Sequence, residues 1–478
     1  MRIVFFVACW VCFVRPAISQ TTGNDSIFIA PPYLQIGYHP SPTTLDLLWH
    51  AKDVDDNWSV EISKSKGNWD KMNKPVPTRI TTANLPEHFV YRAALAGLTP
   101  GETFSYRVLK GTDVVFTADA KAPKTADQSY RFIASGDIGA ATTDAKKLAY
   151  QAWLAKPDLV VVPGDIVYEN GLISEYRTKF WPVYNANEAN AQGAPLMRSI
   201  PFVAAPGNHD ADTRDLNKFP DALAYYMLWD QPLNGPVGKE GGPLVPVLTA
   251  DAERRKSFEA AAGEAYLRMS NFSFDYGNAH WLVLDADNYV DWTDSSLVKW
   301  VADDLTASGN ATWHFVVFHH PGFNSSREHF EQQQMRLLSP VFESGKVDIV
   351  FNGHVHNYQR SFPMQFVPDK KGTQLVGGKD GKTLRGRVVN GRWTLDKTFD
   401  GKKRTNPKGV IYLVTGAGGQ ELYNPEQQDD PDSWQKFTYK FISSVHSLTV
   451  ADVNGKKLTV RQIAVDGKEI DLFTINKQ

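Results

Sequence analysis

Five short polar motifs in this 478-residue chain supply the side chains that a metal site needs, and each follows an apolar run. In chain order they are Gly136-Asp137-Ile138-Gly139, Gly164-Asp165-Ile166-Val167-Tyr168, Gly207-Asn208-His209-Asp210, Val316-Val317-Phe318-His319-His320 and Gly353-His354-Val355-His356. Together they offer carboxylates, a phenol, an amide oxygen and several imidazoles, a donor set suited to iron, zinc or manganese. Their glycines let the backbone turn sharply after a strand and let a metal or phosphate come close.

Each motif is a weak signal when it is taken alone. A Gly-Asp pair at a strand end most often forms a turn, and a lone histidine is more often a hydrogen-bonding residue than a ligand. The spacing His354-x-His356 is more informative, because on an extended segment it places both rings on one face. Five such motifs in order, each after an apolar strand, favour one shared site over five unrelated turns.

The elements that must position these motifs are read from the apolar runs after Ser129. Those runs alternate with helical segments, which predicts an α/β domain. The expected strands are Arg131–Ala134, Asp158–Val162, Pro201–Ala204, His280–Leu284, His314–Phe318, Asp348–Phe351 and Val410–Val414. Five of the seven end directly on a motif, and α/β folds bind ligands at the carboxyl ends of their strands. We therefore expect the motifs to meet.

The chain before Ser129 has a different pattern. From about Ala30 to Ala120, short alternating strands separated by turns predict a small β-sandwich. These strands are Thr44–Trp49, Trp58–Ile62, Phe89–Leu95, Phe104–Leu109 and Val114–Ala118. The turn Leu98–Gly101, followed by Phe104 and Tyr106, resembles the tyrosine corner of fibronectin type III-like domains. The predicted domains are residues 28–122 and 129–478, joined by a polar linker.

Three further segments carry structural expectations. The insert Ala211–Ala262, rich in proline, glycine and aromatic residues, is either surface decoration or a lid, and the same holds for the Gly- and Lys-rich insert Lys370–Lys408. The tail Ser447–Asn476 is expected to form β-hairpins with turns at Asn454-Gly455 and Asp466-Gly467.

The first residues predict export from the cell. A positive start, an apolar run at 3–14 and the small-x-small site Ala17-Ile18-Ser19 are typical of a signal peptide over residues 1–19. The run is shorter than the roughly 18 apolar residues of a spanning helix, so we expect a secreted or periplasmic protein without a membrane span. Cys9 and Cys12, the only cysteines, lie in this segment, which removes thiolates from the possible ligands and nucleophiles.

The charge balance excludes one class of partner. With 51 basic and 53 acidic residues the net charge is −2, so nucleic-acid binding is not expected. Any anion that the protein recognises must be held by a local site such as a metal cluster.

The motif order GDxG, GDxxY, GNHD, VxxH, GHxH resembles that of the calcineurin-like metallophosphoesterases. Tyr168, three residues after Asp165, is the mark of the purple acid phosphatase branch. Similar segments are Phe274–Gly277, Leu282–Asp285, Trp300 with Asp304-Leu305, and Asn357–Arg360. The amino-terminal sandwich agrees as well, whereas Asp210 departs from the family, in which many members carry Glu. The resemblance implies an α/β metallophosphoesterase sandwich, two mixed β-sheets flanked by helices, preceded by the small all-β sandwich.

The resemblance also implies a division of ligands. The first metal, a ferric ion, would be held by Asp137, Asp165, Tyr168 and His356. Asp165 would bridge to a second, divalent ion of zinc, iron or manganese, which Asn208, His319 and His354 would complete. A phenolate suits Fe(III), and its charge-transfer absorption gives the family its colour.

The implied reaction is hydrolysis of small phosphorylated substrates. A metal-bound hydroxide would attack phosphorus in line with the leaving oxygen. His209 would protonate or stabilise the leaving alkoxide, and His329 would be a second histidine facing the substrate. A phosphomonoesterase of the acid phosphatase type is favoured; a phosphodiesterase or nucleotide-cleaving enzyme on the same site, and a non-catalytic binding protein, remain as alternatives.

Overall fold

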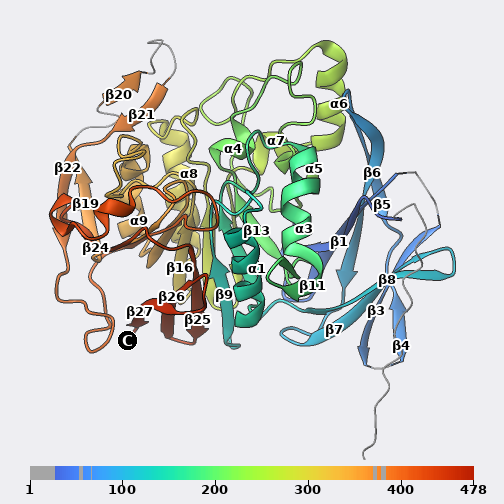
Figure 1. The fold of residues 1–478 in the computed structure, drawn as a ribbon, viewed down its shortest axis with the longest axis horizontal. Coiled ribbons are helices and arrows are strands. Elements are labelled where there is room, and N and C mark those ends of the chain that lie inside the picture. Colours follow the sequence, from blue (N-terminus) through green and yellow to red (C-terminus); the bar gives the residue numbers. More distant parts are fainter. Residues whose placement is uncertain (1–26, 53–56, 66, 370–373, 378–383) are drawn as a thin grey trace, which may run out of the picture.

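The computed structural model describes residues 27–52, 57–65, 67–369, 374–377 and 384–478 (Figure 1). The predicted signal peptide, with Cys9 and Cys12, lies outside the described residues. No helix in the described part of the chain is both long and apolar enough to span a membrane.

The first large sheet has ten strands, and parallel strands form its centre. These are β9 (Tyr130–Ala134), β10 (Leu159–Pro163) and β13 (Phe202–Ala205), which pair in the order β9-β10-β13. Beyond β9 the tail adds three antiparallel strands, β25 (Ser447–Asn454), β26 (Lys457–Ala464) and β27 (Glu469–Asn476). The predicted hairpins of the tail are thereby confirmed.

The second large sheet has seven strands in the order β14-β15-β16-β17-β23-β18-β24. Its strands β15 (Ala279–Val283), β16 (Trp313–Val317), β17 (Ile349–Asn352) and β23 (Ile411–Thr415) are parallel. The antiparallel members are β14 (Phe272–Tyr276), β18 (Tyr358–Ser361) and β24 (Thr438–Ile442). Two mixed sheets flanked by helices are what the family resemblance implies.

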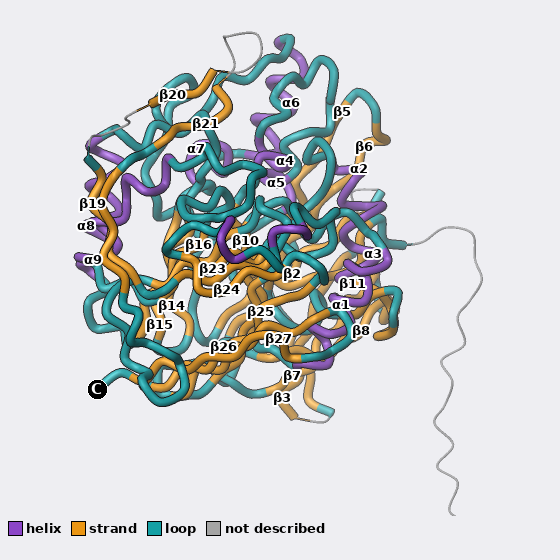
Figure 2. The backbone as a smooth tube through the Cα atoms, turned by 60° about the vertical axis from the view of Figure 1, so that its left-hand side comes forward, coloured by secondary structure: helices purple, strands orange, loops and turns teal. Residues whose placement is uncertain are grey.

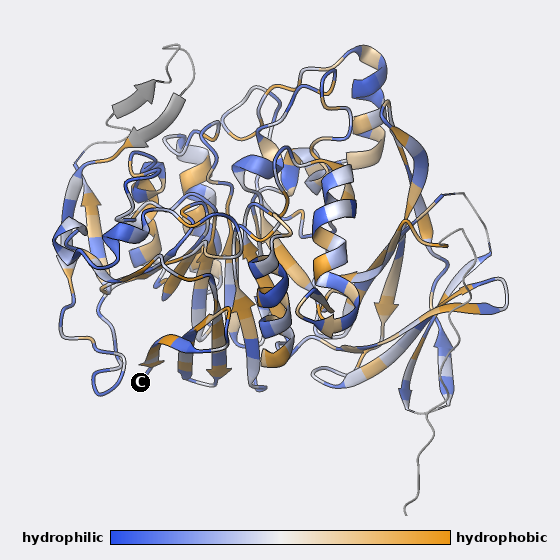
Figure 3. Cartoon of the chain, in the orientation of Figure 1, coloured by the Kyte–Doolittle hydropathy of each residue, from blue (hydrophilic) through white to orange (hydrophobic). Residues whose placement is uncertain are grey.

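The strand alternation separates two cores. Phe132, Trp281 and Phe315 belong to the core between the sheets, with ring centroids of Phe132 and Trp281 4.8 Å apart. Their neighbours Ile133 and Leu282 face the opposite way and join the core beneath the helices. Both faces of each strand are buried, which explains why these strands are continuous apolar runs. Figure 3 shows the hydrophobic residues concentrated on the central strands.

The helices lie around the outside of the strands (Figure 2). The longest are α1 (Thr143–Ala155), α6 (Ala252–Ala262) and α8 (Ser295–Ala307); shorter ones are α2 (Ile173–Glu175), α3 (Trp181–Tyr184), α4 (Asn208–Ala211), α5 (Tyr225–Leu228), α7 (Ala265–Arg268) and α9 (Ser339–Ser344). Helix α1 begins where the Thr142 side chain accepts a hydrogen bond from Ala145 N, and it buries Leu148 and Ala152. It ends at Lys156, whose backbone is left-handed.

The amino-terminal strands form a sandwich with its own core. One layer is β1 (Ala30–Gln35), β2 (Thr44–Ala51), β6 (Leu85–Ala96) and β5 (Val76–Thr82), and the other is β4 (Asn68–Lys71), β3 (Trp58–Ser65), β7 (Thr103–Lys110) and β8 (Asp113–Lys121). Trp49, Tyr91 and Tyr106 are buried between the layers. The first layer also continues the ten-stranded sheet, because Gln35 of β1 pairs with Phe202 of β13. The boundaries 28–122 and 129–478 stay a prediction.

The seven expected strands of the large domain each match a strand of the structure to within one residue at either end. The expected strands do not include β1, β4 and β5 of the sandwich, or β14, β18 and β24 of the second large sheet. The residues of β1 include Pro31 and Pro32, which argue against a strand. In β5 buried and exposed side chains do not alternate, because only Ile80 is buried.

The first insert is not mere surface decoration, and its role as a lid stays a prediction. Its aromatic residues Tyr225, Tyr226 and Trp229 are buried in the helix-side core. The Tyr225 hydroxyl donates to Ala204 O at 3.0 Å, and Trp229 Nε1 donates to the Tyr176 hydroxyl at 3.0 Å. The aromatic composition therefore serves packing. Of the second insert, β20 (Gln374–Gly377), β21 (Leu384–Val388) and β22 (Gly391–Leu395) are described, and β22 pairs with β19 (Met364–Pro368), which precedes the insert.

His280 of β15 is expected to make the stability of this domain pH-dependent. Burial alone lowers the pKa of its imidazole, but Asp275 and Asp304, each 2.8 Å away, outweigh burial and raise that pKa to about 9. A group whose pKa is higher in the folded than in the unfolded protein stabilises the fold below its unfolded-state pKa. That stabilisation is lost as the pH rises through its folded-state pKa. We expect His280→Gln to lower the free energy of unfolding by about 2 kcal/mol at pH 6 and by much less at pH 10.

Urea unfolding of both proteins from pH 6 to pH 10 measures this difference, with the exposed His39 replaced by Gln as the matched control. A gap between His280→Gln and wild type that is the same at every pH contradicts the assignment.

Candidate metal centre

The five motifs meet where the carboxyl ends of strands from the two large sheets face one another. Asp137 N donates to Gly164 O at 3.1 Å, which joins the ends of β9 and β10. Gly353 N donates to His319 O at 3.1 Å, which joins the ends of β16 and β17. The sheets are linked directly, because His354 N donates to Asp137 Oδ2 at 2.9 Å. The expectation that the strand ends converge is confirmed.

The backbone at this junction is unusual in three of the motifs. Asp137, Asp165 and His354 have φ angles of 60°, 53° and 66°, in the left-handed region that few residues other than glycine adopt. Such conformations cost of order 1–3 kcal/mol each and persist where the surrounding structure enforces them. The turns aim all three side chains into one small volume.

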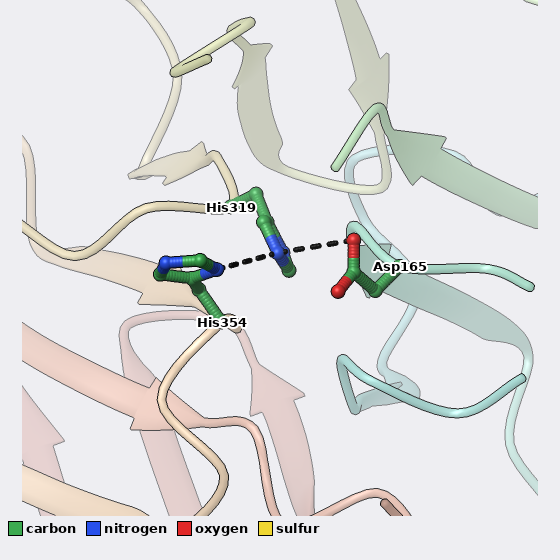
Figure 4. A group of neighbouring side chains, drawn as sticks. All are labelled: Asp165, His319 and His354. Atoms are coloured by element: carbon green, nitrogen blue, oxygen red, sulfur yellow. Dashed lines mark hydrogen bonds and ion pairs between the residues drawn. The ribbon is translucent and has the colours of Figure 1, made fainter. Parts of the chain in front are cut away.

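The first group of donors comprises Asp165, His319 and His354 (Figure 4). Asp165 Oδ1 lies 3.2 Å from His319 Nε2, which in turn lies 3.2 Å from His354 Nδ1. His319 Nδ1 pairs with Pro163 O at 2.8 Å, and this bond leaves Nε2 free to face a cation. One donor atom from each residue falls within 4.8 Å of the others, so a single ion can contact all three.

The second group comprises Asp137, Asp165 and His356, and it shares Asp165 with the first. His356 Nε2 lies 3.4 Å from Asp137 Oδ1, while its Nδ1 pairs with Glu421 O at 2.8 Å. The buried Tyr168 hydroxyl donates to Asp137 Oδ1 at 3.1 Å. A carboxylate common to two donor groups is the arrangement that two neighbouring cations require.

Asn208 begins helix α4 beside the shared carboxylate. The next residue, His209, donates its backbone N–H to Asp165 Oδ1 at 3.1 Å. The side-chain Oδ1 of Asn208 is shielded from solvent and has no hydrogen-bond partner in the described part of the chain. A buried acceptor without a donor is costly, and a cation would satisfy it. The structure thus brings together Asp137, Asp165, Tyr168, Asn208, His319, His354 and His356.

The charges in this cluster compensate one another. Burial alone raises the pKa of Asp165, but His319 and His209 outweigh it and lower that pKa below its usual range. Burial lowers the pKa of His319, and Asp165 then raises it to about 9. For Tyr168, burial and then the charge of Asp137 raise the phenol pKa well above its usual value. The phenol becomes a phenolate ligand only when a highly charged cation displaces its proton.

His209 and His329 lie on opposite sides of the donors. His209 Nδ1 pairs with Glu169 O at 2.8 Å, and its Nε2 is 3.9 Å from Asp165 Oδ2. Burial lowers the pKa of His209, but Asp165 and Glu169 together outweigh burial, and the net effect is to raise that pKa. The His329 ring lies 3.9 Å from that of His354. Burial, followed by the charge of His356, lowers the pKa of His329 to about 4, so this ring is neutral at neutral pH.

Several residues at the site had no assigned role from sequence. Tyr423 stacks on His356 with ring centroids 4.1 Å apart, and no motif marks it. The rings of His320 and His354 pack with centroids 4.0 Å apart. The Nδ1 of His320 lies 3.5 Å from Asp287 Oδ1. Asp210 fixes the turn of the second motif to that of the third, because its carboxylate accepts hydrogen bonds from Ile166 N and Gly207 N. Only the adjacency of His320 to a proposed ligand was a signal in the sequence.

The fold and site define a class of protein: residues 130–358 match the family model described as calcineurin-like phosphoesterase, so the chain carries a domain of that family. Among its homologues are purple acid phosphatases. It is 25% identical to purple acid phosphatase 23 of Arabidopsis thaliana over 80% of this chain and 73% of that protein. It is likewise 25% identical to a nucleotide pyrophosphatase/phosphodiesterase of Hordeum vulgare over 75% of this chain and 86% of that protein.

Two further comparisons delimit this relationship. The chain matches 52% of the length of an Arabidopsis thaliana protein named probable inactive purple acid phosphatase 27, at 26% identity over 65% of this chain. The structure of purple acid phosphatase PPD1 from yellow lupin (Lupinus luteus) superposes with a TM-score of 0.64 and 18% identity, covering 93% of this chain and 74% of that one. The latter match shows that the fold is shared.

Gly207 is expected to be essential for the position of the shared carboxylate. Its φ of −114° is open to any residue, but a Cβ there would lie 2.2 Å from Asp165 Oδ1 and 2.4 Å from Asp165 N. Gly207→Ala must therefore displace Asp165, and we expect the variant to retain fewer metal ions per chain than wild type. Elemental analysis after metal loading and dialysis measures this, with Gly309→Ala on the surface as control. Equal metal content in both variants would contradict the expectation.

Proposed function

We propose that this chain is a binuclear-metal phosphatase that hydrolyses phosphomonoesters, of the acid phosphatase type. The observation that carries the proposal is the Asp165 carboxylate, which belongs to two buried donor groups at once. Two cations held there would bind phosphate oxygens, neutralise developing charge and lower the pKa of a water molecule beside them.

The donor chemistry supports a particular set of ligands. For the first ion we assign Asp137, Asp165, Tyr168 and His356, and for the second Asp165 with Asn208, His319 and His354. The phenol of Tyr168 favours a ferric ion in the first position, because displacing its proton in a buried site needs a strongly charged cation. The nitrogen- and amide-containing second set suits zinc, iron or manganese equally.

The two remaining histidines take different roles in this proposal. The raised pKa of His209 supports a protonated ring that donates its proton to the leaving alkoxide. Its Nδ1 is held by Glu169 O, which leaves Nε2 to face the reacting group. The lowered pKa of His329 supports a neutral ring that orients the substrate through hydrogen bonds instead of supplying a proton.

We further propose that the protein acts outside the cytoplasm. The support is the sequence of residues 1–19, which has the charged start, apolar run and cleavage site of a signal peptide.

Hydrolysis of phosphodiesters or nucleotides is the second candidate function. It is favoured by the similarity to the Hordeum vulgare protein named nucleotide pyrophosphatase/phosphodiesterase. A non-catalytic role has some support in the relative named probable inactive. The presence of all seven proposed donors in one cluster argues for an enzyme.

Replacing the shared carboxylate tests the enzymatic proposal. We expect Asp165→Asn to lower kcat/KM for a nitrophenyl phosphate monoester by at least about a thousandfold, because one bridging charge serves both ions. Rates on the monoester and its bis-ester, from acidic to alkaline pH, also separate the two candidate functions. Asp303→Asn, an exposed change on α8, is the matched control. Faster turnover of the bis-ester would replace the first proposal with the second.

Tyr168→Phe tests the ferric ligand independently of activity. A phenolate bound to Fe(III) absorbs visible light, so we expect the iron-loaded wild type to be coloured and the variant to lose that band. Visible absorption at equal iron content is the measurement, with the partly exposed Tyr439→Phe as control. A band that survives in Tyr168→Phe would remove this residue from the ligand set.

A further inference from the structure

A cavity of about 710 Å³ opens beside His329, outside the proposed metal ligands. The loop formed by residues 325–332 supplies most of its wall, and Asn288, Gln427, Ser433 and Gln435 complete it. His329 belongs both to this wall and to the metal centre, where its ring lies against His354. Through His329 the cavity adjoins the proposed metal centre, which makes it the candidate site for the part of a substrate that lies beyond the phosphate.

The wall is built before any ligand arrives. Asn424 Oδ1 accepts three hydrogen bonds from the loop: from Ser326 Oγ at 2.5 Å, Arg327 N at 3.1 Å and Glu328 N at 3.2 Å. Gln427 Nε2 adds a bond to Ser325 O at 3.1 Å. Because hydrogen bonds already hold the backbone of the loop, ligand binding loses little conformational entropy in the wall. Such preorganisation favours selective recognition.

The groups that remain available on the wall are polar and carry excess negative charge. Within the described chain the side-chain amides of Gln332 and Gln435 make no hydrogen bond. Gln332 Oε1 is shielded from solvent, so Nε2 is the atom of this amide that can face a ligand. Glu328 and Glu331 are exposed and form no salt bridge with described residues. Arg327 is the one cation of the wall, and Glu426 pairs with it at 3.1 Å.

We propose that this cavity binds the leaving group of the substrate and selects uncharged polyhydroxylated groups, so that the preferred substrates are monophosphates of sugars or sugar alcohols. The inference rests on the proposed phosphatase function. Hydroxyl groups both donate and accept, which matches amides and carboxylates at once. A second phosphate on the leaving group is an anion that offers hydrogen-bond acceptors, and the carboxylates of Glu328 and Glu331 would repel it. An aromatic leaving group finds Phe330 as the only hydrophobic residue in the wall.

The test compares three substrates on the metal-loaded full-length protein: glucose 6-phosphate, phenyl phosphate and fructose 1,6-bisphosphate. We expect kcat/KM to be highest for glucose 6-phosphate. Gln332→Leu and Gln435→Leu should each lower the ratio of kcat/KM for glucose 6-phosphate to that for phenyl phosphate about tenfold, the effect of one lost hydrogen bond. Gln192→Leu, in an exposed turn between β11 (Asn185–Asn190) and β12 (Gly193–Pro195), is the matched control.

A second variant tests the charge argument separately. Glu331→Gln removes one carboxylate from the wall, and we expect it to raise the ratio of kcat/KM for fructose 1,6-bisphosphate to that for glucose 6-phosphate several-fold. Because Glu331 is exposed, this variant is expected to fold like wild type, and its melting temperature checks that point.

The outcomes separate the two proposals. A preference for phenyl phosphate or for the bisphosphate, with no selective effect of Gln332→Leu and Gln435→Leu, overturns the inference while the phosphatase function stands. Hydrolysis of none of the three overturns the phosphatase function. In that event calorimetric Kd values of the same compounds still test the cavity proposal. The proposal predicts that glucose 6-phosphate binds most tightly and that Gln332→Leu weakens that binding.

Discussion

The shared carboxylate of Asp165 is the constraint on which the rest of the site depends. A buried carboxylate is unfavourable unless positive charge or hydrogen-bond donors surround it. Here His319, the His209 N–H and the proposed ions provide that compensation. To reach them, the chain accepts a left-handed backbone at Asp165 and a glycine at position 207, where no side chain fits. The convergence of two sheets at their strand ends serves the same requirement.

A shell of hydrogen bonds holds the donors in place. The backbone oxygens of Pro163 and Glu421 fix the rings of His319 and His356 by pairing with Nδ1. Each bond selects the nitrogen that faces the centre, as is usual for histidine ligands. Glycine at 164 has the same purpose, since its φ is +81° and a Cβ there would lie 2.4 Å from His319 Nδ1. Substrate selectivity would then lie in the loops beyond, around His329.

The amino-terminal sandwich is continuous with the catalytic part of the molecule. Its strand β1 extends the ten-stranded sheet, and the buried Arg92 pairs with Asp230 of the first insert at 2.8 Å. Helix α6 of that insert packs against β5. An insert whose aromatic residues are buried and which contacts the sandwich through Asp230 and α6 stabilises the junction. The position of the metal centre thus depends on packing that spans both parts.

The sequence by itself determined the strands that carry the motifs and the donor types that they present, because apolar runs and glycine-containing turns are local signals. It also placed all seven proposed donors, which the fold brings together. Asp165 was expected to be shared from the family resemblance, and the two donor groups agree with that. Only the tertiary structure decided that Tyr423 stacks on His356 and that Tyr225 and Trp229 are core residues. These facts depend on contacts between segments far apart in the chain, and neither spacing nor composition records such contacts.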